Sequence, residues 1–554
     1  MNYKENYNLW KNYKDLDQSL KQELDTLDEN QIEEAFYQDL TFGTGGLRGI
    51  MGVGTNRVNI YTIRKATLGF ARYLLKHNLT DGVAISYDNR KDSKKFAEEA
   101  AKVLAANGIK SYLFNALRPT PMLSFAVRYF KASGGIMITA SHNPKQYNGY
   151  KAYDQTGAQV NPITADLIIE EINNIKNPFD IDTVENDLIH SVDETFDDIY
   201  LNAIKDIKIN DEIKKVKIVY SPLHGTGGPI IPQFLMDQGY EVHPYTPQMI
   251  VDPNFSNTKS SNPEDHEAYE QTIAFAKDID ADIVMVTDPD ADRLGIAVKH
   301  EGTYELITGN QTASVELYYL LSQRKKYNLL PPNGHVYTTN VTTKLIEVIA
   351  RSFELDVITT LTGFKFIGEK AEMYQETNPY IFGCEESYGS LISDVVRDKD
   401  AVQAVYMLAE IANHLKLQGK TIMDYLNEIY DTYGAYYEYT HSISLKGIEG
   451  SKKIQEIMSF FRENPPRLDD KHLLGYDDVQ KSIRVEDGIK SHLDLPKSNV
   501  LKYIFEDDTW IVFRPSGTEP KIKIYYGTKQ KTLEEAKAYL QTIDKQIMKI
   551  IDEI

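Results

Sequence analysis

Three short apolar segments, each followed at once by a cluster of polar residues, constrain the fold of this chain more than any other feature. IMIT (136–139) leads into TASHNP, IVMVT (283–287) into DPDADR, and YIFG (380–383) into CEESYG. Amphipathic stretches of helical length separate such strand-like segments, which predicts α/β layering with parallel strands. Because ligands bind at the carboxyl ends of strands in open parallel sheets, we expect the three clusters to face one cleft.

The chain is too long for one compact core, and its pattern predicts four domains. It has 554 residues, and the alternation of strand-like and helical segments restarts at VKIVY (216–220) and at a helical segment from about Gln311. Near Glu438 the character changes to a tail with a closing helix, in which Thr532 and Glu535 have capping-box spacing. We predict three similar mixed α/β domains over residues 1–208, 209–308 and 309–437, and a C-terminal α+β domain over 438–554, around a central cleft.

Two local expectations concern the N-terminal part. The first forty residues are highly charged, and we expect them to form a helix on the outside of the first domain. The glycine-dense FGTGGLRGIMG is then followed by an amphipathic helix. Its apolar positions at helical spacing are Ile63, Ala66, Ala71, Leu74 and Leu75.

Composition excludes several classes of protein. The formal charge of −20 argues against non-specific binding to nucleic acid or to acidic membrane surfaces, since both need a basic patch. No run of about 18 apolar residues and no secretory signal is present, so we expect a cytoplasmic protein that does not bind membranes. The single cysteine, Cys384, cannot form an internal disulfide, which fits a reducing compartment, and we expect it to serve packing.

The DPDADR segment is a candidate metal site. Asp288, Asp290 and Asp292 offer hard oxygen ligands directly after a buried strand, and such ligands suit Mg²⁺. An EF-hand is excluded, because Arg293 stands where that loop needs Gly and Lys299 where it needs Glu. Arg293 can instead pair with an anion that the metal also contacts. The alternative interpretation is an ordinary solvated acidic turn.

The TASHNP segment is a candidate nucleophile loop. Ser141 stands at the end of a strand in a turn rich in Asn, Pro and Gly. A serine in that place can act as a nucleophile, and a phosphate carried on it can supply an oxygen to a magnesium site made of three aspartates. Ordinary turn chemistry of the adjacent Ser141 and His142 is the competing interpretation.

Four motifs in order make the chain recognisable. TASHNP with Lys151, DPDADR, GCEESYG and RPSGTEPKIK span roughly the whole chain and resemble the alpha-D-phosphohexomutase family, most closely its phosphoglucomutase branch. The resemblance implies an isomerase of carbohydrate metabolism that interconverts glucose 1-phosphate and glucose 6-phosphate. It implies a phosphorylated Ser141, one Mg²⁺ held by that phosphate and the three aspartates, and glucose 1,6-bisphosphate as intermediate and activator. Pentose and mannose phosphates remain alternative substrates, and a monomer and a dimer are both open.

The same resemblance assigns roles to further residues. Arg48 stabilises the transferring phosphoryl group. His142, Lys151 and Lys399 lie near it, the two lysines being candidates for proton transfer. Gly389 stands where some relatives carry a histidine, so that acid or base is absent. The residues expected to contact the substrate are Glu385 and Ser387 for the sugar hydroxyls, Lys365 and Arg293, and for a phosphate Arg514, Ser516, Gly517, Thr518 and Lys521.

Two rival functions use the same residues differently. An apolar strand followed by Asp-x-Asp also occurs in phosphatases with an aspartyl nucleophile, which would make Asp288 the phosphorylated residue. In that class the pair normally lies near the start of the chain, whereas here it lies in the middle. A non-enzymatic protein whose interactions depend on phosphorylation is the second rival.

Overall fold

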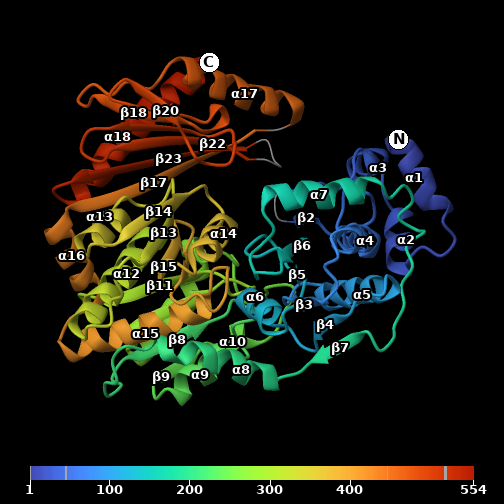
Figure 1. Ribbon diagram of the computed structural model, residues 1–554, viewed down its shortest axis with the longest axis horizontal. Helices are drawn as coiled ribbons and strands as arrows, with labels where there is room; N and C mark the ends of the chain where they lie inside the picture. Colours follow the sequence, from blue (N-terminus) through green and yellow to red (C-terminus); the bar gives the residue numbers. More distant parts are fainter. Residues whose placement is uncertain (1, 44–45, 446, 517–520) are drawn as a thin grey trace. The chain divides into compact units, whose positions relative to one another are not determined.

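The computed structural model describes residues 2–43, 46–445, 447–516 and 521–554 (Figure 1). Two compact units make up the chain. The first comprises Met1–Gly309, Phe364–Gly383 and Ser387–Thr421, and the second comprises Asn310–Gly363, Cys384–Glu386 and Ile422–Ile554. The chain first passes into the second unit after Gly309, and it passes into it again within strand β15 (Tyr380–Glu385) and after Thr421.

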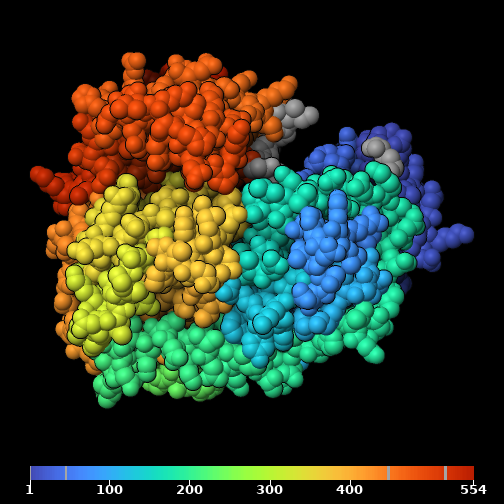
Figure 2. Space-filling view, in the orientation of Figure 1, coloured from blue at the N-terminus to red at the C-terminus, as the bar shows by residue number. Residues whose placement is uncertain are grey.

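Three short helices replace the single N-terminal helix expected from the sequence: α1 (Tyr3–Asn12), α2 (Gln18–Leu24) and α3 (Glu29–Phe36). The prediction of one helix was wrong because polar side chains cap new helix starts; Asp17 accepts the N–H of Ser19, and Asp28 that of Gln31. The position on the outside of the first unit is confirmed (Figure 2, dark blue). Trp10 nevertheless belongs to the buried core.

The first unit contains a seven-stranded mixed sheet of order β1-β2-β6-β5-β3-β4-β7. β3 pairs in parallel with β4 and β5, and β5 pairs antiparallel with β6. Tyr87 at the end of β3 lies opposite Ile138 at the end of β5, so the loops after these two strands are neighbours. The strands are β1 (Phe42–Gly43), β2 (Gly46–Ile50), β3 (Val83–Tyr87), β4 (Ser111–Phe114), β5 (Gly134–Ile138), β6 (Tyr147–Asp154) and β7 (Ile189–Val192).

Five α-helices belong to the segments around this sheet (Figure 1): α4 (Ile60–Lys76), α5 (Ser93–Ala106), α6 (Thr120–Tyr129), α7 (Pro162–Asn173) and α8 (Thr195–Ile204), the last continued by the 3-10 turn η1 (Lys205–Ile207). Four of the five apolar positions predicted for α4 are buried. Leu75 is 42% exposed, so its prediction was wrong. A helix turns about 100° per residue, and with Leu74 facing the core the next side chain points away from it.

The second sheet of the first unit has the order β12-β11-β10-β8-β9. β10 pairs in parallel with β8 and antiparallel with β11, and every residue of β10 is buried. The loop from β10 to β11 is the DPDADR segment. The strands are β8 (Lys217–Ser221), β9 (Glu241–Pro244), β10 (Ile283–Thr287), β11 (Leu294–His300) and β12 (Thr303–Ile307).

Further elements of the first unit follow these strands or return to the unit later in the chain: α9 (Ile231–Asp237), α10 (Thr246–Met249), η2 (His266–Ala268), α11 (Glu270–Ile279), α14 (Phe364–Tyr374), β16 (Gly389–Leu391) and α15 (Ala401–Leu417).

The second unit begins with α/β elements. β13 and β14 pair in parallel, with His335 opposite Asp356. Cys384 is fully buried, and burial raises the pKa of its thiol, in keeping with a packing role. The elements are α12 (Gly309–Lys326), β13 (His335–Thr339), α13 (Leu345–Ser352), β14 (Asp356–Thr360) and α16 (Ile422–Tyr433).

An antiparallel sheet of order β17-β23-β22-β21-β18-β19-β20 forms the C-terminal part of the second unit. The predicted capping box of the closing helix is confirmed, since Thr532 accepts the N–H of Glu535 and Glu535 accepts that of Thr532. The elements are β17 (Ala435–Ser444), α17 (Gly447–Glu463), β18 (Leu473–Asp478), η3 (Val479–Lys481), β19 (Ile483–Glu486), β20 (Ile489–His492), β21 (Leu501–Phe505), β22 (Trp510–Pro515), β23 (Lys521–Gln530) and α18 (Leu533–Glu553).

The helices do not meet the requirements of a membrane crossing in the part of the chain that the structure describes. The closing helix α18 has 21 residues, with charged side chains at many positions. Within the described ranges, no helix is both long enough and apolar enough to pass through a bilayer.

Candidate active site

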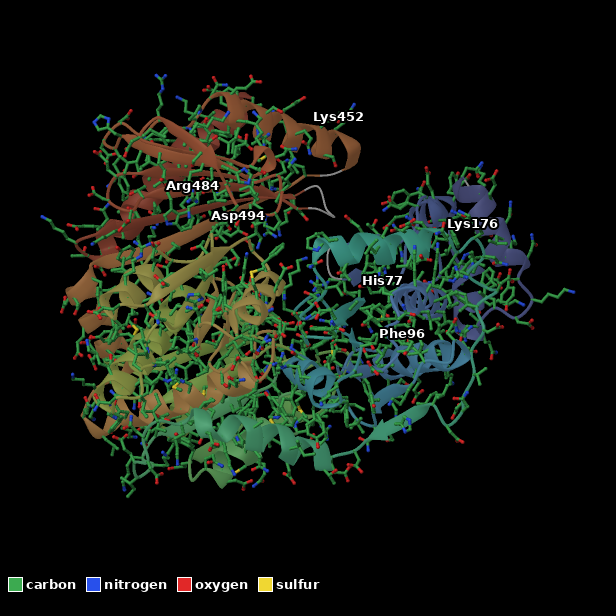
Figure 3. The ribbon with its side chains drawn as sticks, viewed as in Figure 1. His77, Phe96, Lys176, Lys452, Arg484 and Asp494 are labelled. Atoms are coloured by element: carbon green, nitrogen blue, oxygen red, sulfur yellow. The ribbon has the colours of Figure 1, made fainter. Side chains whose placement is uncertain are left out.

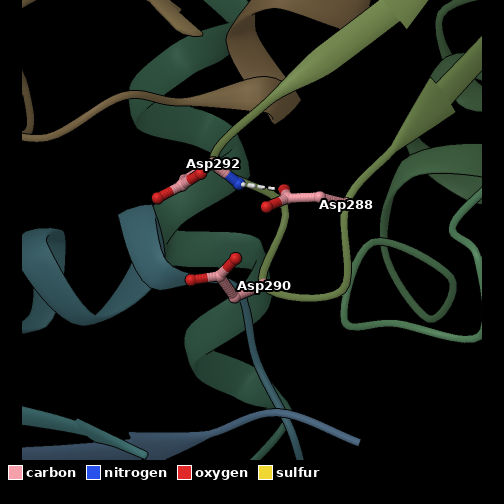
Figure 4. A group of neighbouring side chains, drawn as sticks. All are labelled: Asp288, Asp290 and Asp292. Atoms are coloured by element: carbon pink, nitrogen blue, oxygen red, sulfur yellow. Dashed lines mark hydrogen bonds between the residues drawn. The ribbon is translucent and has the colours of Figure 1, made fainter. Parts of the chain in front are cut away.

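Three buried aspartates occupy the loop that joins β10 to β11 (Figure 4). Asp288 and Asp290 are 0% exposed and Asp292 is 2% exposed. The loop is held by its own backbone, because the N–H groups of Asp292 and Arg293 both donate to Asp288 Oδ1 at 3.1 Å. Thr120, the first residue of α6, donates its hydroxyl to Asp290 Oδ2 at 2.9 Å. The carboxylate of Asp288 is therefore fixed by its own loop, and that of Asp290 by α6.

The donor set fits a divalent cation. One carboxylate oxygen from each aspartate lies within 4.8 Å of the other two. Asp290 Oδ1 and Asp292 Oδ1 are buried, and no described residue donates a hydrogen bond to either. Burial, and then the charges of Asp290 and Asp292, raise the pKa of Asp288 well above its usual value. Oxygen ligands that are buried, crowded and short of donors are what a hard cation needs.

Ser141 reaches this cluster from the first sheet. It follows β5, is 2% exposed, and donates its hydroxyl to Asp288 Oδ2 at 2.8 Å. Its φ of 50° is in the left-handed region, which costs a serine about 1 kcal/mol or more. Thr139 Oγ1 holds the Ser141 N–H at 2.8 Å in that conformation. The predicted neighbourhood of Ser141 and the aspartates is confirmed by this hydrogen bond.

Two lysines face the same aspartates. Lys151 Nζ lies 2.7 Å from Asp290 Oδ2 and 3.2 Å from Asp292 Oδ2, and Lys399 Nζ lies 3.3 Å from Asp292 Oδ2. Burial lowers the pKa of Lys151, but the charges of Asp290 and Asp292 outweigh it and leave the pKa raised. Both lysines thus carry charge that offsets the carboxylates.

Gly389 makes room for Lys399. A Cβ at position 389 would stand 2.0 Å from Lys399 Cδ and 2.8 Å from its Cγ. The aliphatic stem of the lysine therefore crosses the strand β16 where only a glycine leaves space. The absence of a histidine at this position, noted from the sequence, has a structural counterpart, because the space that a side chain would take is filled by Lys399.

Arg90 is a residue of the site that the sequence reasoning missed. It is 3% exposed, follows β3 in YDNR, and its Nε lies 3.2 Å from Asp88 Oδ2. Its guanidinium donates to four backbone carbonyls of the loop around Ser141. These are Ser141 O and Asn143 O at 2.5 Å, Pro144 O at 2.9 Å and Tyr147 O at 3.0 Å. The signal was available, since DNR follows an apolar strand as the three recognised clusters do.

Three other predicted residues of the first unit differ in their exposure and in their contacts. Arg48 on β2 is exposed and donates to Asn143 Oδ1 at 2.7 Å. His142 Nδ1 lies 3.3 Å from Ser141 Oγ, and burial followed by the charges of Arg293 and Arg48 lowers its pKa well below the usual value. Arg293 donates to Glu264 at 2.6 Å, so it is already paired.

Two predicted residues of the first unit lie farther along the chain. Ser387 is half-buried in the turn between β15 and β16. Lys365 is 8% exposed in the first turn of α14, and its Nζ lies 5.3 Å from the ring centroid of Phe366. Their contacts with a substrate stay predictions.

The second unit holds a separate cluster of predicted residues. Glu385 is 4% exposed and accepts the Gly363 N–H at 2.7 Å. Its neighbour Glu386, which the sequence reasoning passed over, accepts from Thr339 Oγ1 at 3.4 Å. Burial, followed by the charge of Glu385, raises the pKa of Glu386 to about 7, while Arg514 opposes that rise.

Arg514 and Ser516 lie at one end of the candidate phosphate loop, and Lys521 lies at the other. Arg514 on β22 donates to the Tyr525 hydroxyl at 3.2 Å, and the Ser516 N–H donates to Lys521 O at 2.7 Å. Gly517 and Thr518 lie outside the described residues.

Comparison with known proteins places this chain in a family. Models of the phosphoglucomutase/phosphomannomutase family match residues 39–179 (alpha/beta/alpha domain I), 198–302 (domain II) and 308–433 (domain III). A phosphoglucomutase of Staphylococcus aureus (strain MRSA252) is 39% identical over 505 residues, which cover 90% of this chain and 91% of the relative. The chain belongs to the phosphoglucomutase/phosphomannomutase family.

Solved structures of this family share the fold. A family protein from Burkholderia thailandensis matches with a TM-score of 0.67 at 18% identity, covering 92% of this chain and 97% of that one. The open form of parafusin, a phosphoglucomutase from Paramecium, matches with a TM-score of 0.68 at 19% identity, covering 93% and 96%. The predicted fold class, three α/β domains and a C-terminal α+β domain, is confirmed.

Family membership also decides the class of chemistry. As a member of this family, the chain is an isomerase that transfers phosphoryl groups, and its substrates are sugar phosphates. The buried aspartates, taken with the family, indicate a metal site. The roles of single residues, and the domain boundaries drawn from the sequence, stay predictions.

Replacing Arg90 by lysine tests whether it positions the Ser141 loop. A lysine presents its three donors at one point and cannot span four carbonyls, so we expect kcat for sugar-phosphate isomerisation to fall at least about tenfold in Arg90→Lys, with the circular dichroism spectrum unchanged. Arg57→Lys, at a partly exposed ion pair, is the matched control and should keep wild-type kcat. Wild-type kcat in Arg90→Lys would show that the four hydrogen bonds do not matter to catalysis.

Replacing Gly389 by alanine tests the space that Lys399 occupies. The added methyl group must displace the Lys399 stem, and we expect kcat to fall about tenfold in Gly389→Ala and little in the neighbouring Ser390→Ala. Because the effect acts through Lys399, Gly389→Ala should cost almost nothing further in a Lys399→Ala background. Additive losses in this double-mutant cycle would contradict the assignment.

Proposed function

We propose that this chain is a phosphoglucomutase that interconverts glucose 1-phosphate and glucose 6-phosphate through a phosphoryl group carried on Ser141. The observation that carries the proposal is the hydrogen bond of 2.8 Å from Ser141 Oγ to Asp288 Oδ2, which joins a strained, buried serine to three buried carboxylates. The family and the Staphylococcus aureus relative supply the reaction class.

Mg²⁺ is the cation that we propose for the aspartate cluster. Asp288, Asp290 and Asp292 would hold it, together with an oxygen of the Ser141 phosphate. Bound there, Mg²⁺ neutralises the phosphoryl oxygens and makes the phosphorus more open to attack. Without the cation, the negative charges of the Ser141 phosphate and of the three buried carboxylates would repel one another strongly.

The first transfer breaks the bond between phosphorus and Ser141 Oγ and forms a bond from phosphorus to the free hydroxyl oxygen of the bound sugar monophosphate. Lys151 and Lys399 are the candidates for proton transfer: a charged lysine donates a proton to Ser141 Oγ as the phosphoryl group leaves it, and then takes up the proton of the sugar hydroxyl. The product is glucose 1,6-bisphosphate. After it turns over, its other phosphoryl group is transferred to Ser141 Oγ, the hydroxyl proton of Ser141 passes to the sugar oxygen that is set free, and the isomer is released.

Arg48 and Arg90 have different parts in this scheme. Arg48, fixed by Asn143, offers a guanidinium to the phosphoryl group that moves. Arg90 acts through the backbone and keeps Ser141 Oγ directed at Asp288. The second unit contributes sugar recognition by Glu385 and phosphate binding by Arg514, Ser516 and Lys521. Glucose 1,6-bisphosphate also serves as activator, because it can phosphorylate a Ser141 that has lost its phosphate.

Replacing Ser141 by alanine tests the function. With Mg²⁺ and a trace of glucose 1,6-bisphosphate, we expect the wild-type chain to convert glucose 1-phosphate, and the rate to fall by about a thousandfold or more in Ser141→Ala because the atom that carries the phosphoryl group is gone. Mass spectrometry should find an acid-stable phosphate on Ser141 of the wild type.

The exposed Ser191→Ala is the control and should retain full activity. Full activity of Ser141→Ala, or a labile acyl phosphate on Asp288, would refute the proposal in favour of an aspartyl nucleophile. In the same assay, kcat/KM for mannose and ribose 1-phosphates should be at least about tenfold lower than for glucose 1-phosphate.

Removing the metal tests the aspartate cluster. We expect a chelator to abolish activity and Mg²⁺ to restore it. In Asp290→Asn, which removes one ligand charge, the Mg²⁺ concentration for half-maximal activity should rise at least about tenfold. The exposed Asp182→Asn should leave that concentration unchanged. Activity that persists in protein shown to be metal-free would contradict the assignment.

A further inference from the structure

A cavity that is partly open to solvent lies in the first unit, apart from the aspartate loop and Ser141. This cavity has a volume of about 400 Å³ and lies among α1, β1, β2, α4 and α7. No residue that we place in the active site lines it. Its apolar wall includes Trp10, Leu40, Phe42, Leu47, Ile169 and Ile172.

The size of this cavity sets it apart from a packing defect. Protein interiors are close-packed, and voids larger than a few water molecules are uncommon. A volume of about 400 Å³ instead lies within the range of small-molecule sites, which are mostly apolar with a few directed polar groups. The cavity also adjoins strand β2, which carries the predicted site residue Arg48, because Leu47 in the cavity wall directly precedes Arg48.

Trp10 is a rigid part of the cavity wall. The ring is 1% exposed and is fixed by edge-to-face contacts with Phe36 at 5.8 Å, Tyr61 at 5.3 Å and Phe179 at 5.3 Å. Its Nε1–H is buried, and none of the described residues accepts a hydrogen bond from it. An indole nitrogen can only donate, and leaving a buried donor unsatisfied costs about 1–3 kcal/mol. Because Nε1 has almost no accessible surface, Trp10 contributes a rigid aromatic part of the wall and no hydrogen bond to a molecule in the cavity.

Charged side chains line one end of the cavity. The charged residues that line the cavity are Asp39, Lys65 and Lys176. Lys65 pairs with Asp39 at 2.6 Å, whereas Lys176 is exposed and donates to the backbone carbonyl of Asn173 at 3.2 Å. The lining thus has one positive charge in excess, on a chain whose formal charge is −20. Such a local excess favours an anionic group at this end of the cavity.

We propose that this cavity is a binding site for a small organic anion with an apolar, ring-sized body, such as an aryl carboxylate or sulfonate. The body packs against Phe42, Leu47 and Ile169, beside the buried ring of Trp10, and the anionic group lies near Lys176.

The test uses 8-anilinonaphthalene-1-sulfonate as the probe and the full chain as the protein. The sequence has two tryptophans, Trp10 and Trp510, so Trp510→Phe leaves Trp10 as the single indole reporter. We expect saturable binding of one probe per chain, with energy transfer from Trp10. Lys176→Glu should weaken binding at least threefold, and Ile169→Phe, which fills the space, at least tenfold.

Lys452→Glu is the matched control, an exposed lysine of the second unit (Figure 3 labels both lysines), and should leave the affinity unchanged. Equal affinity in Lys176→Glu and Lys452→Glu, or bound probe that receives no energy from Trp10, would overturn the proposal. If Ile169→Phe does not fold, the comparison of the two lysines decides alone. Binding is measured without sugar phosphate, so the result does not depend on the mutase proposal.

Discussion

Mutual repulsion of three buried carboxylates is the constraint on which the rest of this site depends. Asp288, Asp290 and Asp292 lie close enough to share one cation, and nothing in an apolar interior would offset their charge. The protein surrounds them with positive charge from other elements, Lys151 on β6 and Lys399 between β16 and α15. The same surplus of negative charge makes the site receptive to a divalent cation, and through it to a phosphoryl group on Ser141.

The geometry of the nucleophile loop is held by backbone contacts rather than by side chains of the reaction. Ser141 is in a left-handed conformation that serine does not favour, and Arg90 donates to the carbonyl of Ser141 itself and to that of Asn143, which follows it. This works because β3 and β5 are parallel neighbours, so that Arg90 and Ser141 emerge at the same edge of the sheet. The free-energy cost of burying the charged guanidinium of Arg90 is offset by its ion pair with Asp88 and by its hydrogen bonds to four carbonyl oxygens.

Many elements of the fold and the main residues of the site could be predicted from the sequence, and particular residues show where such prediction failed. The strand at 283–287 and the capping box at Thr532 were predicted correctly, because burial and capping leave local patterns. Ser141 and the aspartates followed from their motifs and from the rule that strand ends carry ligands. Leu75 and the N-terminal helices were mispredicted, since helical periodicity alone does not say which side is covered or where a helix ends.

The sequence by itself determined the chemistry that is available: a serine, three aspartates, two lysines and the strands that precede them, because residue types and short-range spacing are local properties. Only the tertiary structure decided that Ser141 contacts Asp288 across 147 positions, that Lys399 passes over Gly389, and that Trp10 borders a cavity behind Arg48. These are contacts between segments distant in the chain. They depend on the order of strands in a sheet and on the space left between side chains, neither of which any single segment encodes.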